Sequence, residues 1–202
     1  MKRKEIINLY KKVQKIPYYC LKERDPDLLL KKNKGSCSEK HLFLGKEFGK
    51  LGIPVKYLLI KFDWNDLPIP REIIAKKEDG SVGWHLALKI KPKYMRPPKI
   101  GRFSEKSGTS RGDFSRICEN KLEQSRRDDD AWIYVDATWD PKLEKAGFPV
   151  AKNWDGKSNT KFAVPPKEII ELKKAPPKHA KRPENRKFFD ALNKWLELQR
   201  KK

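Results

Sequence analysis

The amino-acid sequence predicts an α+β domain in which a helix beginning at Cys37 packs against an antiparallel sheet. Apolar residues recur every three or four positions near both termini and after Cys37, as they do in amphipathic helices. Three other segments, residues 55–62, 83–90 and 131–137, are rich in branched and aromatic residues, as strands are. A chain of 202 residues is long enough for one domain with its own core and short for two. We therefore expect residues 1–202 to form a single domain.

Basic residues strongly outnumber acidic ones. The 48 Lys and Arg residues and the 27 Asp and Glu residues give a formal charge of +21. This surplus is spread over the whole chain with acidic residues interleaved, whereas nucleic-acid-binding surfaces gather their cations in clusters. We expect a solvated, lysine-rich surface and keep an anionic partner as the alternative use of the charge.

Cysteine content and hydropathy bear on the compartment. The three cysteines are too few and too scattered for a disulfide framework, and none forms the C-x-x-C pair of a zinc site. No segment approaches the roughly twenty apolar residues that a bilayer requires, and the first residues lack the apolar region of a signal peptide. These features predict a soluble, cytoplasmic protein in a reducing compartment, with no membrane partner.

Two terminal helices are predicted, over residues 3–15 and 184–200. The first must end before Pro17, because proline removes a backbone donor and clashes with the preceding turn. The apolar faces consist of Ile6, Leu9, Tyr10 and Val13 in the first helix and of Phe188, Leu192 and Trp195 in the second. Both faces should pack on the core.

The helix that begins at Cys37 carries signals at both ends. Ser36 and Glu39 form an S-x-x-E capping box, which satisfies backbone N–H groups of the first turn. Gly52 and Pro54 follow the other end, where a glycine tolerates a left-handed turn and a proline cannot continue the helix. One stripe of the helix contains Cys37, His41, Leu44 and Phe48, and Gly45 and Gly49 are expected to permit close approach of another element.

Strand alternation predicts which side chains share a face. In the segment 83–90, His85, Ala87 and Lys89 lie on the face opposite Trp84, Leu86, Leu88 and Ile90. The segment 91–130 is an insertion of about forty residues, which we expect to be partly mobile. Residues 162–174 are expected to form a strand or a short helix on the sheet.

Cys37 is the candidate nucleophile. The pKa of a thiol falls at a helix amino terminus beside an imidazolium, and the N–H groups there can also stabilise an oxyanion. His85 is the predicted base and Asp136 the carboxylate that orients it. His41 and Asp140 are the rivals for these two roles, although a buried His41 is more simply a packed, hydrogen-bonded residue. We expect neither a metal nor a cofactor.

Three motifs together resemble the transglutaminase-like superfamily. They are G-S-C-S-E-K-H followed by L-G-I-P-V, then G-W-H-L-A-L, then V-D-A-T-W, and they occur in the family's order. The likeness covers about residues 17–90 and 131–140 and implies a papain-like, cysteine-proteinase fold of the compact microbial type. It also implies that Cys37, His85 and Asp136 form the catalytic triad. The insertion at 91–130 departs from the short hairpin that usually joins the last two motifs.

The resemblance implies a cysteine-dependent acyl transfer to or from an amide through a thioester. A peptidase, amidase or transamidase is expected, with a peptide or protein amide as substrate, and hydrolysis is favoured because water needs no acceptor site. Two alternatives remain at this point: an N-acetyltransferase-like acyl transferase, and a non-catalytic basic module that binds an anionic partner on the same fold.

Overall fold

The computed structural model describes residues 3–92, 132–178, 180–181 and 185–202. These residues form a mixture of helices and antiparallel sheet, so the α+β class is confirmed. Most of the predicted insertion at 91–130 lies outside the described residues. Among the residues that are described, no helix is both long enough and apolar enough to cross a bilayer.

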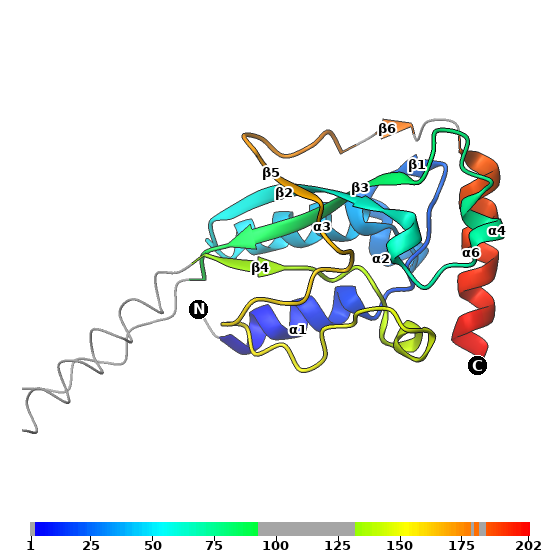
Figure 1. The fold of residues 1–202 in the computed structure, drawn as a ribbon. Helices are drawn as coiled ribbons and strands as arrows, with labels where there is room; N and C mark the ends of the chain where they lie inside the picture. Colours follow the sequence, from blue (N-terminus) through cyan, green and yellow to red (C-terminus); the bar gives the residue numbers. More distant parts are fainter. Residues whose placement is uncertain (1–2, 93–131, 179, 182–184) are drawn as a thin grey trace, which may run out of the picture.

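The main sheet has four strands in the order β4-β3-β2-β5, and each neighbouring pair is antiparallel (Figure 1). The segment that could have been a strand or a helix is a strand, β5. The third predicted strand, 131–137, is shorter than expected, because only three of its residues pair with β3. The strands are β2 (Val55–Asp63), β3 (Val82–Ile90), β4 (Ile133–Val135) and β5 (Glu168–Leu172).

Three longer helices accompany the sheet, and the predicted terminal helices are both present (Figure 1). They are α1 (Arg3–Gln14), α3 (Cys37–Lys50) and α6 (Arg186–Lys201). The short helices are α2 (Leu29–Lys32) and α4 (Arg71–Ile74), with 3₁₀ turns η1 (Pro26–Leu28), η2 (Trp64–Asp66) and η3 (Pro141–Ala146). A second, two-stranded sheet pairs β1 (Glu23–Arg24) with β6 (Ala180–Lys181).

The core consists of two apolar clusters that bury strand β3 on both of its faces. Ala87 and Leu88 point to opposite faces and are both fully buried. Helix α3 reaches both clusters, since Cys37 belongs to the first and Phe48 to the second. The first cluster also holds Leu58, Ile60, Phe188, Leu192 and Leu196, and the second holds Ile6, Tyr10, Leu44 and Ile90. Helix α3 therefore starts in the first cluster and continues into the second.

The carboxyl end of α3 follows the sequence signals. Gly52 adopts a left-handed φ of 71°, and the N–H of Ile53 donates to the Phe48 carbonyl at 3.0 Å, which closes a Schellman motif. A Cβ at Gly45 would lie 2.9 Å from Cζ of Tyr57, so this glycine does permit close approach of β2. The same expectation is wrong for Gly49, where a Cβ would meet nothing within 4 Å.

Candidate active site

Cys37 is the first residue of α3, directly after the cap residue Ser36. The predicted capping box is present, and the Glu39 carboxylate accepts from the Ser36 backbone N–H at 3.1 Å. Because Ser36 is fully buried and Glu39 nearly so, the box anchors the helix start inside the protein. Only 9% of Cys37 is exposed. The thiol is thus held at the positive end of the helix dipole.

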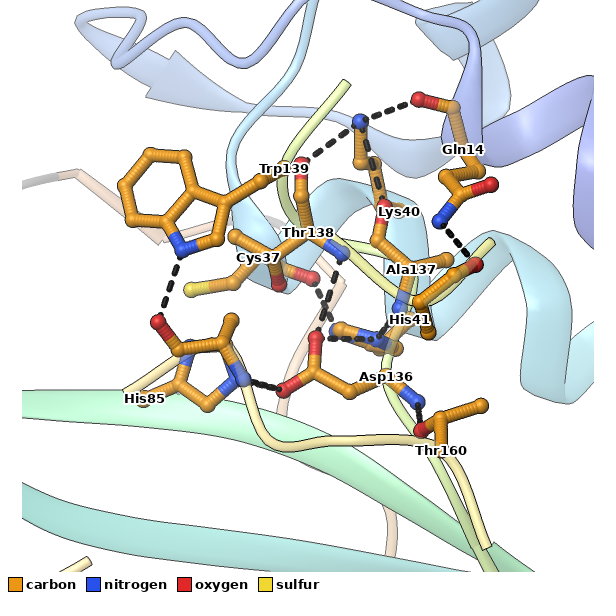
Figure 2. A network of polar contacts seen from close by, with 12 residues as sticks. Gln14, Cys37, Lys40, His41, His85, Asp136, Ala137, Thr138, Trp139 and Thr160 are labelled. Atoms are coloured by element: carbon orange, nitrogen blue, oxygen red, sulfur yellow. Dashed lines mark hydrogen bonds and ion pairs between the residues drawn. The ribbon is translucent and has the colours of Figure 1, made fainter. Parts of the chain in front are cut away.

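His85 lies on β3 and contacts both of its predicted partners. Its Nε2 lies 2.7 Å from Oδ2 of Asp136, and the side chain of Cys37 is close enough to the ring to raise the pKa of His85. Since Nε2 is engaged by the carboxylate, Nδ1 is the ring nitrogen left to exchange a proton with the thiol. Figure 2 shows the Cys37 sulfur, the His85 ring and the Asp136 carboxylate together.

Asp136 directly follows β4 and is held by backbone donors. Its Oδ1 accepts from the Thr138 N–H at 3.1 Å, and its Oδ2 accepts from the Ala163 N–H at 2.8 Å. Its own N–H donates to Oγ1 of Thr160 at 2.8 Å. Burial alone would raise the pKa of Asp136, but the His85 charge and these N–H groups hold that pKa well below its usual value. Asp136 is therefore a buried carboxylate.

The charge state of His85 depends on the same contacts. Burial would lower the pKa of its imidazole, because a charged ring is poorly solvated inside the protein. The negative charges of Asp136 and Cys37 outweigh that effect and raise the pKa of His85 to about 10. A raised pKa favours the imidazolium at neutral pH, and an imidazolium beside a thiol favours its thiolate form.

His41, the rival base, is completely buried and has both ring nitrogens engaged with the backbone. Its Nδ1 lies 2.9 Å from the Cys37 carbonyl, and its Nε2 accepts from the Ala137 N–H at 2.9 Å. An acceptor at Nε2 requires the proton on Nδ1, so the ring is a neutral tautomer. Burial lowers its pKa to about 4. Of the two histidines, His85 is therefore the one beside the thiol, and both ring nitrogens of His41 are occupied by backbone groups.

The three side chains of His41, His85 and Asp136 place their potential ligand atoms within 4.8 Å of one another. A metal ion bound there would need their lone pairs. His41 uses Nε2 to accept from a backbone N–H, and both Asp136 oxygens accept from N–H donors. The cluster is thus organised as a hydrogen-bonded network, which a metal would have to displace.

Asp140, the alternative orienting carboxylate, serves another purpose. It forms an ion pair with Arg200 of α6 at 2.8 Å and accepts from the Tyr18 N–H at 3.2 Å. Cys20 is fully buried, and its backbone N–H donates to Oδ1 of Asn193 at 2.9 Å. Cys118, the third cysteine, and the three consecutive aspartates at 128–130 lie outside the described residues.

The sequence reasoning missed several residues around Asp136. Lys40 is fully buried, and its ammonium lies among backbone carbonyls (Figure 2). Thr160 and Ala163 come from a loop more than twenty residues along the chain. The signal for Lys40 was its position next to His41 on the buried side of α3, where a lysine is unusual. No sequence signal marks the loop residues.

Comparisons with known proteins add no relative. A scan against protein-family models found no match, and searches of curated proteins and of solved structures likewise found no match.

Proposed function

We propose that this chain is a cysteine-dependent acyl-transfer enzyme of the transglutaminase-like kind, acting on an amide through a thioester. One observation carries the proposal. Cys37 at a helix amino terminus lies beside His85, which hydrogen-bonds to the buried Asp136 at 2.7 Å. A nucleophile, a base beside it and a carboxylate that orients the base are the parts that thiol-dependent acyl transfer requires.

The arrangement of elements supports the finer fold assignment within this proposal. The nucleophile helix packs on an antiparallel sheet, and the histidine and aspartate come from neighbouring strands. Val135, one residue before Asp136, pairs with Leu88, three residues after His85. The antiparallel pairing thus brings the two strand motifs of the resemblance to one place.

The reaction follows from the positions of the protons. The Cys37 thiolate attacks the carbonyl carbon of the amide, and the new oxyanion lies near N–H groups of the α3 terminus. As the C–N bond breaks, Nδ1 of His85 gives its proton to the leaving amine, and a thioester remains. His85 then takes a proton from water, the resulting hydroxide attacks the thioester, and the C–S bond breaks. The carboxylic acid leaves, and Asp136 has kept the ring oriented throughout.

Hydrolysis of a peptide or protein amide is the reaction we favour, because it needs no second substrate site. A transamidase or an N-acetyltransferase-like enzyme would use the same thioester and admit an amine or a thiol in place of water. Because the formal charge is +21, the proposal includes an anionic substrate or partner, which such a charge would attract.

The test is labelling with thiol-directed amide and ester probes at neutral pH, followed by mass spectrometry. We expect the label on Cys37 and its loss in Cys37→Ala. In His85→Ala the labelling rate should fall by about two orders of magnitude or more. Cys20→Ala is the matched control, since Cys20 is also buried but lies outside the network, and it should label normally.

Release of labelled product distinguishes catalysis from binding. Turnover of an ester or amide probe by the parent protein, absent in Cys37→Ala, supports an enzyme. A label on Cys20 or Cys118 in place of Cys37 would show that the nucleophile is wrongly assigned. Stable labelling of Cys37 with no turnover of any acyl probe would instead favour the non-catalytic binding module.

A further inference from the structure

Lys40 is a completely buried lysine one turn after Cys37. Its Nζ donates to three backbone carbonyls, those of Gln14 at 3.3 Å, Ala137 at 3.2 Å and Thr138 at 2.7 Å. An ammonium has three N–H donors, so the charged form of Lys40 has one donor for each of the three carbonyls. A neutral amine has only two donors and would leave one carbonyl unpaired.

The charged and ionisable groups that face Lys40 are Asp140, Arg200, Asp136 and Cys37. Burial lowers the pKa of the Lys40 ammonium to about 7, while the charge of Asp140 opposes that effect. Burying a lysine is costly even when it is hydrogen-bonded, and such charges contribute little to stability in comparison with apolar side chains. A role in fixing geometry accounts for Lys40 better than a role in stability.

His41, the next residue on α3, binds the other backbone polar group of Ala137. It accepts from the Ala137 N–H at 2.9 Å, while Lys40 donates to the Ala137 carbonyl. Both backbone polar groups of Ala137 are thus held by two consecutive residues of one helix (Figure 2). Sheet pairing does not perform this task, because β4 ends at Val135, before Asp136.

We propose that Lys40 and His41 are positioning residues that hold the backbone of Ala137 on both sides and thereby place Asp136 against His85. The helix that presents Cys37 also fixes the start of the segment after Asp136. The positions of the nucleophile and of the orienting carboxylate are consequently both set by helix α3. This inference rests on the proposed function, but it concerns the geometry of the site and is tested separately.

The first test compares Lys40→Met with Lys77→Met. Methionine has similar length and no donors. Lys77 is the matched control, because it is also buried and its Nζ donates to a backbone carbonyl, that of Gly80, outside the site network. The readouts are the pH profile of Cys37 alkylation by iodoacetamide and the low-field NMR signal of the His85 Nε2–H that bonds to Asp136.

In Lys40→Met we expect the alkylation profile to move by about one pH unit to the alkaline side, which is about tenfold slower labelling at pH 6. The low-field His85 signal should also be lost. Lys77→Met should keep both. A folded Lys40→Met with the parent profile and signal would overturn the proposal. A shifted profile with the His85 signal intact would also overturn it, because it would show a field effect of the lysine charge without positioning.

His41 provides the second pair of variants should Lys40→Met fail to fold. Gln can accept from the Ala137 N–H through its amide oxygen, whereas Leu cannot. His41→Gln should therefore keep the profile and the signal that His41→Leu loses. Equal behaviour of the two variants would refute positioning by His41. If Cys37 of the parent protein fails to react at all, the proposed function fails instead.

Discussion

Replacing Asp136 with Asn tests how the buried carboxylate acts. Its Oδ2 accepts from His85 Nε2 and from the Ala163 N–H, whereas its Oδ1 accepts from the Thr138 N–H. An amide has one acceptor oxygen, which will take the position facing two donors. The NH₂ group then faces the N–H of Thr138. The variant keeps the ring orientation of His85 but loses one backbone hydrogen bond and the negative charge.

The two losses have separate magnitudes. Leaving the buried Thr138 donor unpaired costs about 1–3 kcal/mol of unfolding free energy. A neutral hydrogen bond to His85 in place of a charged one costs roughly 1 kcal/mol more. Since 1.4 kcal/mol corresponds to about one pKa unit, the pKa of His85 should fall by about one unit. A lower pKa of His85 disfavours the thiolate–imidazolium pair relative to the neutral thiol–imidazole pair, so Cys37 gives up its proton less readily.

The assay measures urea unfolding and, from pH 5 to 10, the rate of iodoacetamide alkylation at Cys37. Asp136→Asn should shift the alkylation profile by about one pH unit to the alkaline side, or about tenfold in rate at a fixed acidic pH. Asp155→Asn is the control, because Asp155 also accepts from backbone N–H groups, those of Lys157 and Ser158, but lies outside the site network. It should lose stability without shifting the profile. An unchanged profile in Asp136→Asn, or equal shifts in both variants, would refute the reasoning.

Two further predictions concern stability. Gly45→Ala should lower the unfolding free energy by about 1–3 kcal/mol, because the new Cβ meets the Tyr57 ring. Gly49→Ala should raise the unfolding free energy by about 0.5–1 kcal/mol, because its Cβ enters open space. Urea unfolding of both variants checks this contrast, and changes of the same sign would contradict it. The pKa of His41 is about 4 in the folded protein and 6.5 in the unfolded chain, so the unfolded chain binds more protons between these two pH values. The unfolding free energy therefore falls as the pH drops from 6.5 to 4, by about 3 kcal/mol at most. Unfolding of the parent at pH 7, 5.5 and 4 should show this loss, and a His41→Gln variant with the same pH dependence would argue against it.

The sequence determined the elements whose signals are local. The capping box at Ser36 and Glu39 and the glycine at position 52 mark the ends of α3, because each satisfies backbone groups within a few residues. Strand alternation likewise predicted that His85 lies on the face opposite its neighbours. These signals placed the candidate nucleophile and base on the correct kinds of element.

Local signals could not decide which distant groups meet. His85 bonds to Asp136 across 51 positions of the chain, and Asp140, only four residues further, pairs with Arg200 of α6 instead. Both aspartates are compatible with the same strand-then-turn pattern. Strand pairing and the packing of α6 select between them.

The tertiary structure alone decided the environment of Asp136. The position of Lys40 beside His41 indicates a buried lysine, but only the fold shows that three carbonyls from two other segments converge on its ammonium. The glycine at 49 shows the converse, since its sequence context predicted a close approach and the fold leaves open space there. Helix ends and strand faces depend on neighbours in sequence, whereas burial and hydrogen-bond partners depend on segments that the chain brings together only on folding.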